Sequence, residues 1–226
     1  MLRAVIFDFD GVIADTEAMH FKAFNQALQP YQVQISKEAY FKEYLGFTDR
    51  DLLKTLVEEG TLKIKKSNIE TIAQKKTGIF EEMLKSHVEI INGVSEFLEM
   101  LEENDIAMAI CSGALLDEIE LILDKAGLRR YFQAIVSAER VRRGKPAPDG
   151  FLVALEQLNE KCDGSIKAGE CVVVEDSRWG LEAAKAAGMR TVAVTNSYQA
   201  GELALADRIV GNLSELTMED LQSLCG

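Results

Sequence analysis

The sequence predicts a doubly wound α/β fold, with a Rossmann-like parallel sheet interrupted by an inserted all-helical domain. From residue 90 onward, short β-prone runs alternate with segments of helical periodicity, as in a parallel sheet covered on both faces. Between residues 15 and 89, apolar residues instead recur at three- and four-residue spacing, and no convincing β-prone run appears. We therefore expect an α/β core formed by residues 1–14 and 90–226 and a helical insertion formed by residues 15–89.

The first strand is expected at residues 4–9, where Val5, Ile6 and Phe7 form a continuous β-prone run. The helical insertion follows, from Glu17 to about Ser86. In the second part of the core, strands are expected at 106–111, 133–137, 171–176, 191–194 and 208–210. Helices are expected at 94–103, 115–126, 149–159, 179–187 and 214–223. This order gives the alternating strands and helices of a doubly wound sheet.

Composition and charge narrow the possible partners. The net charge of −12 disfavours nucleic acid and acidic membrane surfaces, which bind basic proteins. No apolar stretch is long enough to span a bilayer, and no signal-peptide pattern is present. The four cysteines show neither metal-ligand spacing nor a dense disulfide framework, and a chain of this size does not need disulfides, so we expect a protein of the reducing cytoplasm. The sequence does not decide the oligomeric state, and a monomer fits it.

Polar residues follow the predicted strands at their carboxyl ends, which is the edge where open parallel sheets bind ligands. An acid pair follows the first strand and another ends the fourth, a serine follows the second, and a lysine lies in the loop after the third. These residues are Asp8, Asp10, Ser112, Lys145, Glu175 and Asp176. We expect the four loops to bring them to one edge of the sheet.

Such a set of residues predicts phosphoryl chemistry. Two acid pairs at one edge need a compensating positive charge, because each desolvated carboxylate costs several kcal/mol. Oxygen ligands favour Mg²⁺, which also binds phosphate oxygens. With a lysine and a hydroxyl opposite, the site suits phosphoryl transfer. In it, Asp8 can attack phosphorus to form an aspartyl-phosphate, and Asp10 can serve as general acid and base.

The chain resembles the haloacid dehalogenase superfamily over its whole length. The resemblance is carried by four ordered motifs: "DFDGV", the serine after an apolar strand, "GKPAPD" and "VVVEDSRWGLEAAKAAGM". It implies that Asp8 is the nucleophile and Asp10 the acid and base. It also implies that Ser112 and Lys145 hold the phosphoryl group.

The same resemblance implies a metal and a mobile cap. Mg²⁺ would be bound by Asp8, by the backbone carbonyl of Asp10 and by Asp176, with Glu175 assisting. The helical insertion would be a cap that closes over the substrate and excludes water. Because the dehalogenases of the superfamily use no metal and lack the second acid, Asp10 favours phosphoryl chemistry over halide displacement.

Hydrolysis is favoured over isomerisation. The stretch "DFDGVIADTEAMH" is similar to that of the beta-phosphoglucomutases, including Thr16 and His20. After the second-motif serine, however, those mutases carry a serine, a lysine and an asparagine that handle the sugar phosphate. This chain has Ala114, Leu115 and Leu116 there, so the second phosphate pocket of a mutase is not expected.

We therefore expect a phosphatase that acts on a small phosphorylated metabolite, a sugar phosphate or a similar organic phosphate. The alternative is a sugar phosphomutase of the beta-phosphoglucomutase type. A second alternative is a non-catalytic protein that binds a phosphorylated ligand. The presence of all four complete motifs argues against a binding protein, because a site that only binds a ligand has no need of both Asp8 and Asp10.

Candidate substrate-binding residues lie mainly in the helical insertion. They are Thr16, His20, Arg50 and Lys76, together with Gly113 in the core. A solvated helix face accounts for the basic residues of the insertion about as well. For His20 the competing interpretation is a packed helix histidine.

Overall fold

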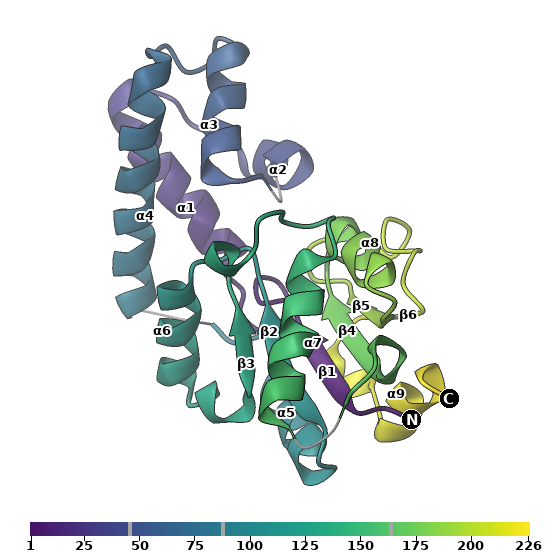
Figure 1. Ribbon diagram of the computed structural model, residues 1–226. Helices are drawn as coiled ribbons and strands as arrows, with labels where there is room; N and C mark the ends of the chain where they lie inside the picture. The colour runs from purple at the N-terminus through teal and green to yellow at the C-terminus, as the bar shows by residue number, and fades with distance from the viewer. Residues whose placement is uncertain (45–46, 87–88, 163–164) are drawn as a thin grey trace. The chain divides into compact units, whose positions relative to one another are not determined.

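The computed structural model describes residues 1–44, 47–86, 89–162 and 165–226 (Figure 1). The chain forms two compact units. One consists of Met1–Asp15 and Val88–Gly226, and the other of Thr16–His87. We refer to them as the α/β unit and the helical unit.

The α/β unit is built on one parallel sheet of six strands in the order β3-β2-β1-β4-β5-β6. The strands are Ala4–Phe7 (β1), Ala107–Cys111 (β2), Ala134–Val136 (β3), Cys171–Glu175 (β4), Arg190–Val194 (β5) and Arg208–Val210 (β6). The strand that comes first in the chain, β1, lies at the centre between β2 and β4. The predicted doubly wound α/β fold is confirmed.

Helices cover both faces of this sheet (Figure 1). They are Val94–Glu103 (α5), Leu116–Ala126 (α6), Asp149–Lys161 (α7), Arg178–Ala186 (α8) and Met218–Leu224 (α9). Successive side chains of a strand point to opposite faces. Ile6 accordingly packs in one buried cluster with Phe151 of α7, whereas Phe7 meets Phe97 of α5 edge-on at 6.0 Å between ring centroids. Burial on both faces explains why β1 is apolar throughout.

The helical unit contains Glu17–Leu28 (α1), Lys37–Ala39 (α2), Asp49–Glu58 (α3) and Ile69–Ser86 (α4). A π-helical turn, Tyr40–Tyr44, follows α2. The described residues of this unit include no strand. Its apolar faces form a core of their own around Leu28, Leu53 and Ile72. Across the described parts of the chain, no helix combines the length and apolarity needed to cross a bilayer.

Several elements differ from their predicted bounds, most by one or two residues, and the local structure explains the differences at the first strand and the last helix. The first strand ends at Phe7 instead of residue 9, because the Phe9 carbonyl accepts hydrogen bonds from the amides of three following residues and turns the chain. The last helix was expected at 214–223, and its start is wrong. A 3₁₀ turn spans Leu213–Glu215, and α9 begins only after Thr217, whose hydroxyl accepts the Asp220 amide as an N-cap.

Candidate active site

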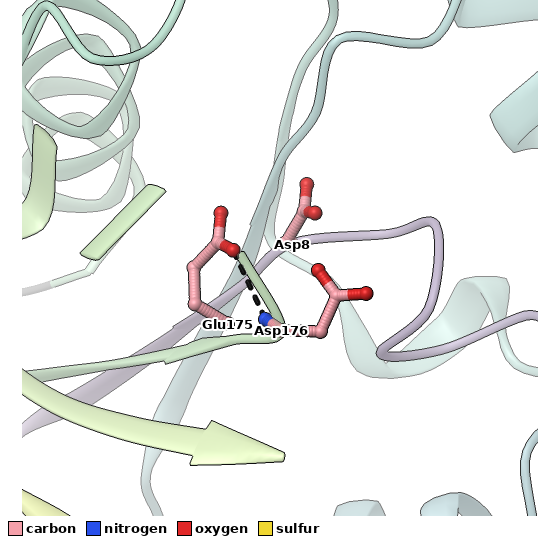
Figure 2. Close-up of side chains that lie close together, drawn as sticks. All are labelled: Asp8, Glu175 and Asp176. Carbon is pink, nitrogen blue, oxygen red and sulfur yellow. Dashed lines mark hydrogen bonds between the residues drawn. The ribbon is translucent and has the colours of Figure 1, made fainter. Parts of the chain in front are cut away.

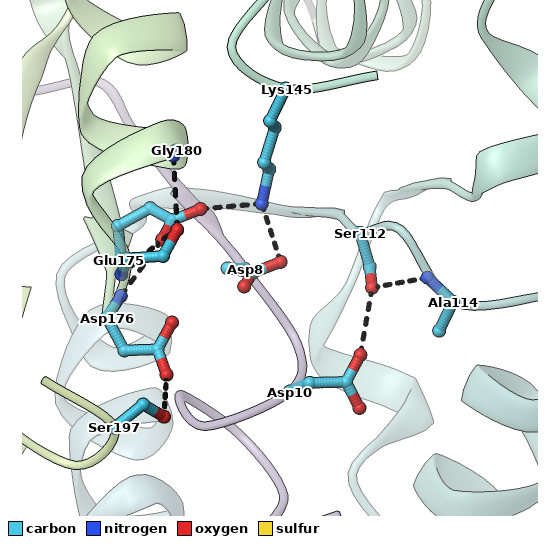
Figure 3. A network of polar contacts seen from close by, with 10 residues as sticks. Asp8, Asp10, Ser112, Ala114, Lys145, Glu175, Asp176, Gly180 and Ser197 are labelled. Carbon is cyan, nitrogen blue, oxygen red and sulfur yellow. Dashed lines mark hydrogen bonds and ion pairs between the residues drawn. The ribbon is translucent and has the colours of Figure 1, made fainter. Parts of the chain in front are cut away.

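The loops at the carboxyl ends of the strands bring together all six polar residues that the sequence singles out in the core (Figure 3). Asp8 directly follows β1, and its amide still donates to the Val174 carbonyl of β4 at 2.9 Å. Ser112 directly follows β2 and makes the corresponding bond to Val136 of β3. The last ladder bonds of the sheet therefore fix the backbone of both residues.

Lys145 lies between two carboxylates (Figure 3). Its Nζ is 2.7 Å from Asp8 Oδ1 and 2.6 Å from Glu175 Oε1. Burial acts to lower the pKa of Lys145, but Asp8 and Glu175 together outweigh it, so the pKa is raised well above the ordinary lysine value. The side chain is therefore a fixed ammonium shared by two acids.

Glu175 is held by its own loop. Its fully buried Oε2 accepts hydrogen bonds from the amides of Asp176 and Ser177, at 3.0 and 2.9 Å, and from Ser177 Oγ at 2.8 Å. Ser177 Oγ in turn accepts the Gly180 amide at 3.1 Å and so caps α8. One oxygen of Glu175 thus fixes the loop, while the other holds Lys145.

Asp8, Glu175 and Asp176 form a compact acidic triad (Figure 2), in which one carboxylate oxygen of each residue lies within 4.8 Å of the others. Burial raises the pKa of Asp8 to about 7, with Glu175 and Asp10 adding to this effect and Lys145 opposing it. Burial, followed by Glu175 and Asp8, also raises the pKa of Asp176 well above its ordinary value. Three buried carboxyl groups therefore face a single lysine.

This triad fits a divalent metal ion. The donors are all oxygen atoms, which suits Mg²⁺, and a divalent cation would neutralise the charge that Lys145 leaves unbalanced. Asp8 and Asp176 would hold the ion, with Glu175 assisting, as the family resemblance of the sequence implies. A bound Mg²⁺ would supply positive charge to the oxygens of a phosphoryl group.

Asp10 lies apart from the triad and faces Ser112 (Figure 3). Its Oδ2 is 3.5 Å from Ser112 Oγ, which also accepts the Ala114 amide at 3.0 Å. Gly113, next along the chain, is exposed. The first acid of the "DFD" motif, Asp8, thus belongs to the triad and binds Lys145, whereas the second, Asp10, faces the Ser112 hydroxyl.

Lys76 and His20, predicted substrate contacts, pair with each other inside the helical unit. Lys76 is buried, and its Nζ lies 2.6 Å from His20 Nδ1 and 2.9 Å from Asp49 Oδ1. The His20 ring stacks on Phe80 at 4.0 Å between ring centroids. Lys76 therefore does not belong to a solvated helix face. Its ammonium binds a histidine and an aspartate within its own unit.

The other two candidates of the helical unit differ in exposure. Arg50 is exposed, and its guanidinium binds the Glu70 carboxylate through two hydrogen bonds of 2.8 and 3.0 Å. Thr16 is buried and precedes the first residue of α1. Arg50 matches the solvated helix face that the sequence left open, with its charge paired by Glu70.

Sequence reasoning missed two residues of the network. Asn196 and Ser197 follow β5, and they contact Gly11 and Asp176 respectively. The signal was available, since they are polar residues after a buried strand. Cys111, directly before Ser112, is buried, and burial raises the pKa of its thiol to about 12.

Comparisons with known proteins agree with this geometry. The family model described as haloacid dehalogenase-like hydrolase matches residues 5–194. The chain is 32% identical to the phosphorylated carbohydrates phosphatase of Thermotoga maritima, over 90% of each protein. It is 29% identical to the beta-phosphoglucomutase of Bacillus subtilis, over 96% of this chain and 93% of that protein. Among solved structures, CbbY of Rhodobacter sphaeroides in complex with phosphate superposes with a TM-score of 0.86 and 25% identity, covering 98% of this chain and 100% of that one.

Proposed function

This chain belongs to the haloacid dehalogenase-like hydrolases and is a phosphoric monoester hydrolase, and we propose that its substrate is a small phosphorylated sugar or a similar organic phosphate. We further propose that the reaction depends on Mg²⁺ and passes through an aspartyl-phosphate on Asp8. The observation that carries this proposal is that Lys145 binds two members of the acidic triad, Asp8 and Glu175, while Asp10 faces Ser112 apart from them.

The first half of the reaction transfers the phosphoryl group to the protein. An oxygen of Asp8 forms a bond to phosphorus while the bond between phosphorus and the substrate oxygen breaks. The departing oxygen takes a proton from the carboxyl group of Asp10. Lys145 and Ser112, positioned by the two neighbouring loops, hold the oxygens of the phosphoryl group and stabilise their charge.

The second half releases phosphate. Asp10, now a carboxylate, takes a proton from water, and the water oxygen bonds to phosphorus. The bond between phosphorus and Asp8 breaks, which restores the free carboxylate and gives inorganic phosphate. Asp10 can donate the proton in the first half and take one in the second because it lies two residues after Asp8 and outside the triad.

The start of α6 supports hydrolysis over isomerisation. A helix N-terminus with free amides could hold a second phosphate. Here the Leu115 amide donates to Glu118 Oε2 at 3.3 Å, and the Leu116 amide donates to Glu139 Oε2 at 3.0 Å. Two carboxylates of the chain thus occupy the place of an external anion, and the side chains of Leu115 and Leu116 are apolar.

A sugar phosphomutase is the second candidate, favoured by the similarity to the Bacillus beta-phosphoglucomutase. Thr16, His20, Arg50 and Lys76 stay predicted substrate contacts, as does Gly113. A reducing compartment such as the cytoplasm suits the four free cysteines.

The test is phosphate release from a panel of phosphorylated compounds, with Mg²⁺ and with EDTA. The panel comprises hexose and pentose phosphates, phosphoglycolate, glycerol phosphates, nucleotides and pyrophosphate. Beta-glucose 1-phosphate is also followed for conversion to the 6-phosphate. We expect release only with Mg²⁺, nearly all of it lost in Asp8→Asn and about 10²–10⁴-fold lost in Asp10→Asn. Asp117→Asn, which changes the same charge at an exposed position of α6, should keep full activity.

Three outcomes would contradict parts of the proposal. Full activity of a folded Asp8→Asn protein would exclude the aspartyl-phosphate. Isomerisation of beta-glucose 1-phosphate without net phosphate release would establish the mutase. Binding of phosphorylated compounds without turnover of any of them would support the non-catalytic alternative, a protein that only binds a phosphorylated ligand.

A further inference from the structure

The loop after β5 reaches two loops that carry candidate metal ligands. Asn196 Nδ2 donates to the backbone carbonyl of Gly11 at 2.8 Å. Ser197 Oγ donates a short hydrogen bond to Asp176 Oδ2 (Figure 3). Two adjacent side chains of one loop therefore contact both the loop after β1 and the loop after β4.

The sheet order makes this double contact notable. β5 pairs with β4 but not with β1, which lies one strand further along. Asn196 reaches past the β4 position to Gly11, the residue that follows Asp10. The backbone carbonyl of Asp10 is an expected metal ligand. The β5 loop thus connects the two backbone segments that must be held together for a metal ion to bind.

The backbone of Gly11 also lies very close to the side chains of Asp176 and Ser197. Gly11 has a φ of +76°, and a Cβ atom placed there would lie 1.9 Å from Asp176 Oδ2 and 2.7 Å from Ser197 Oγ. The Asp176 carboxylate therefore lies directly against the Gly11 backbone, with the Ser197 hydroxyl beside it. Because Oδ2 accepts the hydroxyl, rotation of the carboxylate would break this bond.

We infer that Ser197 and Asn196 are positioning residues for the metal site. Ser197 fixes the rotation of Asp176, and Asn196 fixes the backbone after Asp10. Neither residue touches the reacting atoms. Partners of this kind affect metal affinity through the ligand that they orient, typically by about 10–100-fold. The inference rests on the proposed Mg²⁺ dependence.

The test measures Mg²⁺ binding to the full chain by isothermal titration calorimetry, beside the Mg²⁺ dependence of phosphate release. We expect Ser197→Ala to weaken Mg²⁺ binding about tenfold, with turnover at saturating Mg²⁺ within about threefold of wild type. Ser197→Thr, which keeps the hydroxyl at a partly exposed position, should restore binding. Asn196→Ala should show a smaller loss in the same direction.

The control is Ser223→Ala in α9, where the hydroxyl donates to the Asp220 carbonyl far along the chain from the site residues. It should bind Mg²⁺ as wild type does. Unchanged Mg²⁺ affinity in a folded Ser197→Ala protein would overturn the positioning role while leaving the proposed function intact. Phosphate release by the wild type without any measurable Mg²⁺ binding would overturn the metal premise, and this inference with it.

Discussion

The shared ammonium of Lys145 is the residue on which the charge balance of the site depends. It binds Asp8 and Glu175 at once, and all three side chains are largely removed from water. Removing one partner of a buried ion pair is costly because the remaining charge stays desolvated. The same contact holds Asp8, the proposed nucleophile, in place.

His20 is a second residue whose surroundings determine its charge. Lys76 Nζ can only donate, so His20 Nδ1 must accept, and the ring is neutral with its proton on Nε2. Burial, with Lys76 adding to it, lowers the pKa of His20 well below its ordinary value of 6.5. Asp49 faces the same lysine and balances its charge.

This arrangement predicts acid sensitivity of the helical unit. Below about pH 6.5 the unfolded histidine binds a proton that the folded one does not, so stability falls as the pH falls. We expect His20 to contribute a loss of up to about 2 kcal/mol in the free energy of unfolding between pH 6.5 and 5. Urea unfolding of wild type and His20→Gln at pH 7 and 5 measures it. Equal pH-dependent losses in the two proteins would contradict the prediction, since their carboxyl groups are the same.

The site residues of the core were predictable one by one, but their contacts were not all predictable. Asp8 and Ser112 each follow an apolar run, as does the Glu175–Asp176 pair, and the rule that ligands bind at carboxyl strand ends brings them together. The bond from Ser197 to Asp176 depends on β5 lying next to β4. Apolar runs reveal where strands are but not which strands are neighbours.

At the scale of elements, the start of α8 is adapted to the Glu175 carboxylate. A Cβ atom at Gly180 would lie 1.6 Å from Glu175 Oε1, the oxygen that binds Lys145. The helix therefore needs a glycine in its first turn although its backbone there is ordinary. Gly180 is needed because the absence of a Cβ atom leaves space for the Glu175 side chain, not because the backbone turns there.

Gly180→Ala should consequently displace Glu175 from Lys145. We expect a loss of about 2–4 kcal/mol in the free energy of unfolding, together with most of the phosphate release. The matched control is Gly78→Ala in α4, where an added Cβ would meet nothing within 4 Å. That change should stabilise the protein by about 0.5–1 kcal/mol. Urea unfolding and phosphate release compare the two variants, and a fully stable, active Gly180→Ala protein would disprove the role of Gly180.

Element boundaries show where local signals suffice. The interior strands and the helices between them lie close to their predicted positions, because periodicity is strong where both faces or one face are buried. The last helix was placed too early, at residue 214. Leu213 lies in a 3₁₀ turn and Leu216 is extended, but both are buried, and their three-residue spacing resembles that of a helix. The capping pair Thr217 and Asp220 is the sequence signal for the true start of α9.

At the scale of the whole molecule, the two units bury separate cores. One cluster in the α/β unit surrounds Phe151 and Val173, whereas that of the helical unit surrounds Leu53 and Ile72. The candidate metal ligands all belong to the α/β unit. A ligand that binds only the folded form stabilises the unit that binds it.

Differential scanning calorimetry should therefore resolve two transitions that respond differently to Mg²⁺. At a concentration about 100 times its dissociation constant, Mg²⁺ should stabilise the α/β unit by about 2.7 kcal/mol and raise its midpoint by about 5–10 °C. The transition of the helical unit should not move. Asp176→Asn should lose most of the shift, and a single transition that moves as a whole would show that the units unfold together.

The central position of β1 has a consequence for how the protein is made. Ala4 pairs with Ala107 on one side and with Cys171 on the other, so this apolar strand leaves the ribosome long before either partner exists. The helical unit is one continuous stretch of sequence, so it can form in the meantime, before the rest of the α/β unit is made. Until β2 and β4 are synthesised, the strand that precedes Asp8 has neither of its partner strands. During that interval β1 is an unpaired apolar segment, and such segments are prone to aggregate unless a chaperone protects them.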